Sequence, residues 1–376
     1  MKKILALALV LVLALGASSV ALADTIKIGG IAPLTGAASA YGLLVKDGVD
    51  LAVDEFNANG GLLGNQIEMV WLDDTHDAVE ATNDYNQLVS EGIAALIGPV
   101  TTTPTLAVAA RAATDNMPMI TASATAYDVT SAGGNVFRAC FLDPFQAELM
   151  AQYAAQNLSA KKVAVLFDNT NDYSIGLSDA FQAKAKELGM EVVAAESAVA
   201  GDADYSPQLT KIAEAAPDAV FICYYYQDAA LMLRQAVDVG LTATMMGADG
   251  WGSIEQQLTD APELLDKAVY CDSFSAADDS AVAQAFVKAF GAKYDGRTPA
   301  GFNALGYDAA KIMFTAINAA GSTDKAAIIE KLKATDLDCA TGHITFNDHN
   351  DPIKSAFIMG FKDGVPTLVT RIDPAK

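Results

Sequence analysis

Histidine, cysteine and the usual catalytic motifs are scarce in this 376-residue sequence. None of its four cysteines lies in the C-x-x-C spacing of zinc or thioredoxin-type sites. It has no G-x-S-x-G, H-E-x-x-H or Walker A motif, and His76, His343 and His349 are not close in sequence to the hydroxyl clusters described below. A hydroxyl without a base is a weak nucleophile, so only a Ser–Lys pair or a distant histidine would allow hydrolysis. We therefore expect no enzyme, no metal and no cofactor.

Positive charge is also scarce, because 24 Lys and Arg face 46 Asp and Glu for a net charge of −22. Such a surface repels nucleic acid and anionic lipid, although local dipoles can still hold a small anion. Apolar residues make up 52% of the chain, which excludes disorder. The length is too great for one hydrophobic core and suits two domains.

The first 23 residues have the pattern of a cleaved secretory signal peptide. Lys2 and Lys3 precede an unbroken apolar run at 4–15, and residues 21–23 form an A-x-A cleavage site. An uncleaved anchor needs a longer apolar run, and no later run is long enough to span a membrane. We expect a soluble periplasmic monomer that begins at Asp24. Any two of Cys140, Cys271 and Cys339 could pair in an exported protein. The fourth cysteine, Cys223, lies in an expected buried strand.

Strand-like and helix-like segments alternate along the whole chain, which predicts parallel α/β sheets. Expected strands are 25–31, 66–72, 94–98, 117–120, 136–138, 162–167, 191–195, 219–223, 243–247, 269–272, 343–346, 355–360 and 368–371. Expected helices are 42–57, 78–89, 104–115, 144–158, 175–188, 207–215, 228–239, 280–294, 302–320 and 325–334. The alternation forms two series of similar length without a flexible linker, which favours two domains joined by several crossovers.

Hydroxyl side chains follow two successive strands of the first series. They are Thr101, Thr102 and Thr103 after strand 94–98, and Thr121, Ser123 and Thr125 after strand 117–120. Pro104 suits the first position of a helix, so we expect Thr103 to be its N-cap. The carboxyl ends of parallel strands meet at one crevice, where hydroxyls and free helix N–H groups can hold a small anion. The alternative is that these residues only cap helices and end strands.

An acidic residue and several aromatic residues follow strands of the second series. Asp249 lies between Ala248 and Gly250, where a turn aspartate is the alternative to a ligand-binding carboxylate. Tyrosines at positions 224–226 suit an apolar cleft wall with polar tips, although we expect one of them to be core. The acidic runs 73–77 and 348–351 lack the EF-hand spacing and are interpreted as loops.

Seven segments together resemble one protein family. They are IGGIAPLTGAASAYG (28–42), NANGGLLG (57–64), IGPVTTTPT (97–105), ITASAT (120–125), FDNTNDYSIG (167–176), MGADGW (246–251) and GYDAAK (306–311). The order and spacing of this set resemble the exported solute-binding proteins of branched-chain amino acid ABC transporters, the type I periplasmic binding proteins. The resemblance covers essentially all of the chain after residue 23.

The resemblance implies two doubly wound parallel-sheet lobes joined by a hinge of three crossovers. Lobe 1 would comprise 24–143 and 273–351, and lobe 2 would comprise 144–272 and 352–376. It further implies an amino acid bound between the lobes, an aliphatic one by our interpretation of the aromatic residues, and an ABC permease as partner. By family matching, the ligand carboxylate would contact Thr102, Ser123 and Thr125, and the ligand ammonium would contact Asp249. The remaining parts of the ligand would contact Tyr41, Tyr173, Tyr225 and Phe302. Trp251 would either narrow the side-chain pocket or cap the helix that begins at Ser253.

The sequence departs from the family at two points. Asp249 stands where the family often has glutamate, and residues 75–77 and Thr101 include no cysteine for the disulfide that some members form there. Two other functions remain as alternatives. A receptor for an amide, urea or aromatic acid would leave the Asp249 carboxylate without an ammonium partner, and an extracellular amidohydrolase would need a base that the motifs do not provide.

Overall fold

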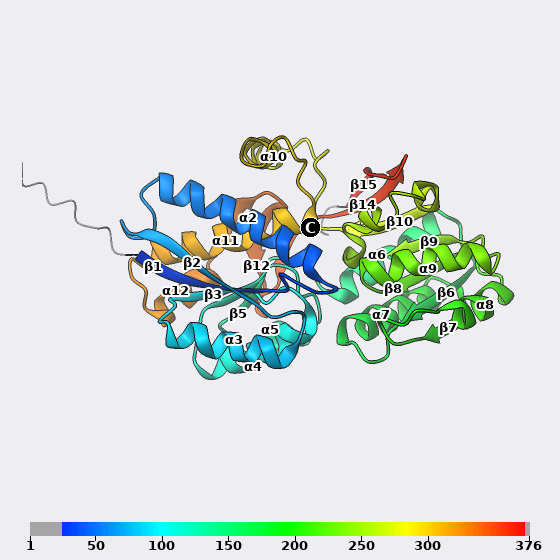
Figure 1. The fold of residues 1–376 in the computed structure, drawn as a ribbon, viewed down its shortest axis with the longest axis horizontal. Coiled ribbons are helices and arrows are strands. Elements are labelled where there is room, and N and C mark those ends of the chain that lie inside the picture. Colours follow the sequence, from blue (N-terminus) through cyan, green and yellow to red (C-terminus); the bar gives the residue numbers. More distant parts are fainter. Residues whose placement is uncertain (1–24, 373–376) are drawn as a thin grey trace, which may run out of the picture.

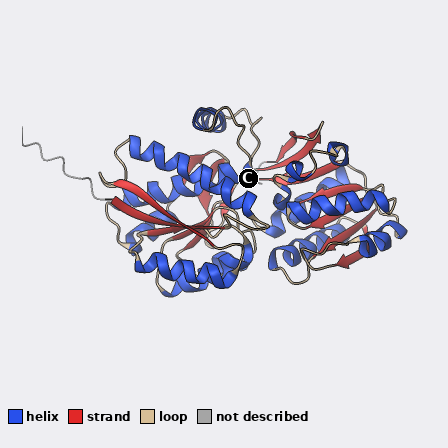
Figure 2. Ribbon diagram, in the orientation of Figure 1, coloured by secondary structure: helices blue, strands red, loops and turns tan. Residues whose placement is uncertain are grey.

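The chain folds into two α/β lobes that lie side by side and are joined by three crossovers, as the computed structural model of residues 25–372 shows (Figure 1). Helices cover both faces of a central sheet in each lobe (Figure 2). The predicted fold class is confirmed. The proposed signal peptide lies outside the described residues, and within 25–372 no helix is long and apolar enough to cross a membrane.

Lobe 1 contains a five-stranded parallel sheet in the order β2-β1-β3-β4-β5. Its strands are β1 (Thr25–Ala32), β2 (Gln66–Asp73), β3 (Ala95–Ile97), β4 (Met119–Thr121) and β5 (Val136–Arg138). Its helices are α2 (Ser39–Ala58), α3 (Ala78–Ser90), α4 (Thr102–Thr114), α5 (Asp128–Ser131), α10 (Ala281–Lys293), α11 (Gly301–Ala320) and α12 (Lys325–Lys333). A small antiparallel sheet completes the lobe with β11 (Asp336–Cys339), β12 (Gly342–Phe346) and β13 (Pro352–Ile353).

Lobe 2 contains a seven-stranded sheet in the order β15-β14-β10-β9-β8-β6-β7. Its strands are β6 (Lys162–Phe167), β7 (Glu191–Ser197), β8 (Ala219–Cys223), β9 (Thr244–Gly247), β10 (Ala268–Asp272), β14 (Ala356–Lys362) and β15 (Val365–Ile372). Its helices are α6 (Asp143–Gln156), α7 (Asp172–Glu187), α8 (Ser206–Glu214), α9 (Tyr226–Asp238) and the 3-10 turns η1 (Asp249–Trp251), η2 (Ile254–Gln257) and η3 (Pro262–Leu265). The sheet has five parallel strands, β6 to β10, and β14 and β15 extend it in antiparallel pairing.

Two glycines allow α2 and α11 to cross closely on one face of the lobe 1 sheet. A Cβ on Gly48 would lie 2.0 Å from the carbonyl oxygen of Asn303, and one on Gly306 would lie 2.2 Å from that of Val45. Since no side chain fits at either point, this approach requires glycine. The crossing places the start of both helices, with Tyr41 and Phe302, at the edge that faces lobe 2.

Buried polar contacts tie the crossovers together. The Lys354 ammonium, in the third crossover, donates to the carbonyl of Ala139 in the first crossover at 3.0 Å and to the Thr341 hydroxyl at 2.6 Å. Arg138 forms a buried ion pair with Asp351, with 2.8 Å between Nε and Oδ1. Asp351 belongs to one of the acidic runs interpreted above as loops. All four cysteines are buried and free, so Cys140, Cys271 and Cys339 form no disulfide.

The predicted N-cap of helix α4 is wrong. Helix α4 begins at Thr102 and its N-cap is Thr101, so Thr103 lies inside the first turn and Pro104 in its third position. The Thr101 side chain makes no capping bond to the helix and instead contacts the Nδ1 atom of His76 at 2.7 Å. Three consecutive threonines offer three equivalent caps, and only the tertiary contact selects one of them.

Candidate ligand-binding site

The predicted site residues, with the exception of Trp251, surround one cavity between the lobes. We call it the interlobe site. Its lining comprises Tyr41, Val100, Thr101, Thr102, Ser123, Thr125, Tyr173, Tyr225, Asp249, Gly250 and Phe302. The cavity measures about 10 Å³, which is about the space that one water molecule requires. An amino acid can therefore enter only if the lobes or the side chains move apart.

The lobe 1 face of the interlobe site is uncharged and carries hydroxyl groups. Strands β3 and β4 are parallel neighbours, so their carboxyl ends bring the two hydroxyl clusters together. Gly98 follows β3 and has a backbone φ of 107°. A Cβ atom at this position would lie 2.1 Å from the Ile31 carbonyl oxygen. The chain then turns into α4, whose first N–H groups have no partner within the helix. The Ser123 hydroxyl donates to the Val100 carbonyl at 2.8 Å, whereas the Thr125 hydroxyl oxygen is buried without a hydrogen bond.

The lobe 2 face is organised around Asp249, which follows β9 and is 5% exposed. Its Oδ1 atom accepts from the Tyr173 hydroxyl at 2.9 Å and from the Gln146 amide at 3.1 Å. Gln146 also accepts from the Asp249 backbone N–H at 3.0 Å. Burial raises the pKa of Asp249 to about 6, although these hydrogen bonds oppose the rise. The carboxylate is thus held in place without a cationic partner among the described residues.

A second carboxyl group, Asp143, lies beside Asp249 and is not one of the predicted site residues. Gln146 donates to both, since its Nε2 atom is also 3.0 Å from Asp143 Oδ1. The Oδ2 atom of Asp143 is buried without a partner. Burial, and then the charge of Asp249, raise the pKa of Asp143 to about 8. Only the i, i+3 spacing of Asp143 and Gln146 at the start of α6 could have indicated this pair from sequence.

Aromatic rings close the rest of the interlobe site. Tyr41 stacks on Phe302 with 4.5 Å between ring centroids, and Tyr225 stacks on Tyr173 at 5.1 Å. The Tyr41 hydroxyl reaches across to lobe 2, where it accepts from the Tyr226 N–H at 3.0 Å and donates to the Gly250 carbonyl. Burial holds the pKa of Tyr41 well above its usual value, so the hydroxyl keeps its proton. Tyr41 is therefore a direct contact between the lobes.

Trp251 lies behind the site and does not line it. The indole is fully buried and donates to the Ile222 carbonyl at 3.2 Å. Its ring covers Gly247, where a Cβ would lie 2.1 Å from the indole. Trp251 is the last residue of η1, and its role as a wall of the side-chain pocket or as a helix cap stays a prediction. Of the three consecutive tyrosines, only Tyr225 lines the cavity.

His76 is a neighbour of the site that sequence reasoning missed. The loop after β2 places its ring beside Tyr225, with centroids 5.6 Å apart, in addition to its contact with Thr101. Burial lowers the pKa of His76, so the imidazole is neutral near pH 7. Within residues 25–372 its side chain makes no hydrogen bond to a carboxylate. The sequence separation of 25 positions between His76 and Thr101 gave no signal of this contact.

Comparison with known proteins agrees with this geometry. Residues 25–365 match the periplasmic binding protein family. Leu/Ile/Val-binding protein homolog 3 of Brucella melitensis is 34% identical over 358 residues, covering 93% of this chain and 95% of that protein. Leu/Ile/Val-binding protein BraC3 of Rhizobium johnstonii is 34% identical over 353 residues, covering 92% and 94%.

Solved structures show the same arrangement of lobes. The leucine-binding protein LivK of Thermotoga maritima has a TM-score of 0.88 at 36% identity, with 93% of this chain and 99% of that chain covered. The substrate-binding protein LivJ of Streptococcus pneumoniae, solved with isoleucine, has a TM-score of 0.87 at 33% identity, with 94% and 100% covered. By sequence and by fold, this chain belongs to the periplasmic binding protein family.

Proposed function

We propose that this protein is an extracytoplasmic receptor that binds a free aliphatic amino acid between its lobes and delivers it to an ABC permease. The observation that carries the proposal is the opposition of hydroxyl groups on lobe 1 and the Asp249 carboxylate on lobe 2 across one cavity. A zwitterion needs donors at one end and a negative charge at the other. Burying either of its charges unpaired costs about 3 kcal/mol or more.

The geometry suggests a role for each contact. Thr102, Ser123 and Thr125, with the first N–H groups of α4, would hold the ligand carboxylate. Asp249 would accept from the ammonium while Tyr173 and Gln146 keep its carboxylate oriented. Tyr41, Tyr225 and Phe302 would surround an apolar side chain. The names of the relatives, which specify leucine, isoleucine and valine, support an aliphatic ligand.

Binding would proceed by opening and closing of the lobes about the three crossovers. Because Asp143 begins α6 and β13 pairs with β12, we assign 25–142 and 273–353 to lobe 1, and 143–272 and 354–372 to lobe 2. Only a closed arrangement brings both charged ends of the ligand into contact with protein. We further propose that the protein acts as a periplasmic monomer after removal of residues 1–23, and that the family's role as a substrate receptor holds here in place of catalysis.

A thermal-shift screen of the chain without residues 1–23 against the standard amino acids tests the proposal. A ligand that binds only the folded state stabilises it by about 4 kcal/mol at a thousandfold excess over Kd. We expect leucine, isoleucine or valine to produce the largest shift. A shift with amides or aromatic acids and none with amino acids would overturn the proposal in favour of a different receptor.

The contact between Thr101 and His76 is the one observation that favours a test for hydrolysis. We expect amino acid amides that are incubated with the protein to be recovered with unchanged mass, because within residues 25–372 the His76 side chain has no hydrogen bond to a carboxylate that would orient it as a base. Mass spectrometry of the recovered compound decides between receptor and amidohydrolase. If the wild type consumes the amide and His76→Ala does not, the protein is an amidohydrolase.

A further inference from the structure

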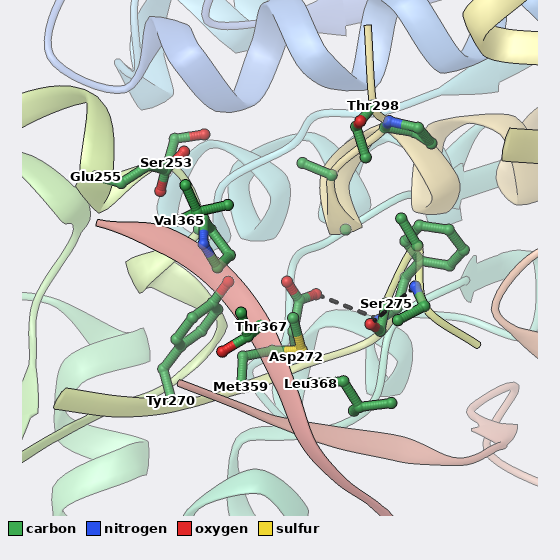
Figure 3. Close-up of a pocket in the computed structure, with 18 residues that line it drawn as sticks. Ser253, Glu255, Tyr270, Asp272, Ser275, Thr298, Met359, Val365, Thr367 and Leu368 are labelled. Carbon is green, nitrogen blue, oxygen red and sulfur yellow. Dashed lines mark hydrogen bonds between the residues drawn. The ribbon is translucent and has the colours of Figure 1, made fainter. Parts of the chain in front are cut away.

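A second and much larger cavity opens between the lobes beside the middle crossover (Figure 3). We call it the hinge cavity. Its volume is about 540 Å³, and it shares no lining residue with the interlobe site. Its walls come from η2, the end of β10, the β14–β15 hairpin, the crossover at 274–277 and the turn at 298–301. The Phe302 ring packs against Gly252, where a Cβ would be 2.9 Å from it, and so separates the two cavities.

The hinge cavity is lined by two carboxyl groups and by no lysine, arginine or histidine among the described residues. Asp272 is 7% exposed, and its Oδ1 atom accepts from the backbone N–H groups of Ser273 and Phe274 at 2.6 and 3.4 Å. Its Oδ2 atom points toward the cavity in Figure 3 and accepts no hydrogen bond within residues 25–372. Glu255, on the opposite wall, has a buried Oε2 atom without a partner.

Neither of these two carboxylates forms an ion pair with a side chain of residues 25–372. Lys354, the cation whose charge acts on Asp272, donates instead to the Ala139 carbonyl and the Thr341 hydroxyl. Burial raises the pKa of Asp272 to about 7 and also raises that of Glu255. A cation that entered the cavity would offset the cost of keeping both groups ionised.

The remaining walls of the hinge cavity are largely apolar. The Tyr270 ring, Met359 and Leu368 lie around the carboxylate of Asp272 (Figure 3). An inorganic cation would leave this surface without a partner, whereas a hydrocarbon body attached to an ammonium would cover it. We propose that the hinge cavity binds an organic amine, with its ammonium against Asp272 and its apolar body against Tyr270, Met359 and Leu368.

Titration with 2-phenylethylamine, followed by NMR of the methionine methyl groups, tests the proposal. We expect saturable shifts at Met359, which lines the cavity, and none at Met117 in the core of lobe 1. The neutral analogue 2-phenylethanol has the same body without the charge, and we expect it to bind at least about tenfold more weakly. Equal affinity for amine and alcohol, or no shift at Met359, would overturn the proposal.

Variants locate the binding in the hinge cavity. We expect Asp272→Asn to lower the affinity for the amine by about ten- to a hundredfold, and Glu255→Gln to lower this affinity by a smaller factor. The matched control is Glu263→Gln, since Glu263 is exposed and does not line the cavity. If Asp272→Asn fails to fold, Thr367→Phe serves instead, because Thr367 lines the cavity and a larger side chain there is expected to weaken amine binding. Asp249→Asn also removes a charge that raises the pKa of Asp272, so it is compared with Asp272→Asn. A loss of amine binding in Asp249→Asn as large as that in Asp272→Asn would place the amine in the interlobe site and refute the proposal, whether or not leucine binds.

Discussion

The two faces of the interlobe site differ in charge and in how far their polar groups already have partners. On lobe 1 the groups are neutral hydroxyls, and Ser123 and Thr101 already contact a backbone carbonyl and an imidazole. On lobe 2 the buried carboxyl groups Asp249 and Asp143 share the single amide of Gln146. Neither face alone offers a ligand both a donor set and a negative charge.

This difference indicates where discrimination and affinity originate. Neutral donors on strand ends and at a helix N-terminus can bind many small anions, so under the proposed function lobe 1 would recognise a carboxylate without requiring an amino acid. The ionised form of a buried carboxylate is costly unless a cation arrives, so lobe 2 would select ligands that carry an ammonium. Substitutions on lobe 2 are therefore expected to have larger effects than those on lobe 1.

Asp249→Asn is expected to have the largest effect on affinity. The substitution keeps the shape of the side chain and leaves the ligand ammonium buried without its charged partner. Breaking a buried pair in this way costs about 3–5 kcal/mol, or roughly a hundredfold to a few thousandfold in affinity. Calorimetry with leucine and with its deaminated analogue 4-methylpentanoate measures the effect. The analogue should bind the wild type poorly and gain relative to leucine on the variant, so equal discrimination by both proteins would refute the role of Asp249.

Asp143→Asn is expected to stabilise the fold at alkaline pH. The pKa of Asp143 is about 8 in the folded chain against an ordinary value of 3.8, so the folded state binds the proton more tightly than the unfolded state. Stability is then fully present below about pH 4 and falls as the pH rises toward 8. Asparagine removes this loss, and we expect a gain on the order of 5 kcal/mol at pH 8 that disappears near pH 4. Urea unfolding at both pH values measures it, with the exposed Asp172→Asn as control; an equal gain at both pH values would contradict the assignment.

Sequence patterns predicted those parts of the fold that local chemistry determines. Strands β5, β6 and β8 have the predicted bounds, because each is a short apolar run between turn residues. Strand β11 was missed, since Asp336–Cys339 alternates acidic and apolar residues and forms only by pairing with β12. Element ends were least certain where several residues can serve equally as caps, as at α4.

The candidate site was predictable only in part for the same physical reason. The hydroxyl clusters after β3 and β4 can be located from sequence because the carboxyl ends of parallel strands share one edge of the sheet. Asp249 can be located in the same way, because it follows the carboxyl end of β9. Asp143, Gln146 and His76 reach the site through the crossover and through a loop with φ of 67° at His76, which are tertiary features without a sequence pattern. The direction of the Trp251 side chain depends on Gly247, which offers the space beneath its ring.

The lobe 1 hydroxyls sharpen the comparison through smaller effects. We expect a loss of about 1.5–3 kcal/mol in the binding free energy of leucine in each of three variants, Thr102→Ala, Ser123→Ala and Thr125→Ala. This is the value of a hydrogen bond to a charged group. Their cost in stability should differ, since Ser123→Ala leaves the Val100 carbonyl unpaired, whereas the Thr125 hydroxyl forms no hydrogen bond of standard geometry and lies beside the Asp143 carboxyl group. The matched control is Thr114→Ala on the exposed side of α4. Unchanged affinity in all three variants would show that these residues are only caps.

Tyr41→Phe tests whether the two faces are held together without a ligand, and it is expected to have the smallest effect. The hydroxyl of Tyr41 is the group through which lobe 1 contacts the backbone of Tyr226 and Gly250 in lobe 2. Phenylalanine keeps the stacking on Phe302 and removes both hydrogen bonds, so the closed arrangement loses about 1–3 kcal/mol relative to an open one in which water satisfies the same backbone groups.

Small-angle scattering separates this effect from a loss of binding. We expect the radius of gyration of Tyr41→Phe without ligand to exceed that of the wild type, and the two proteins to become equal when leucine is saturating, because the ligand then joins the faces through its own charges. Tyr307→Phe is the matched control, since its hydroxyl bonds Glu55 within lobe 1. If Tyr41→Phe scatters like the wild type in the absence of leucine, the Tyr41 hydroxyl does not hold the lobes together, and the opposition of the two faces alone determines when they close.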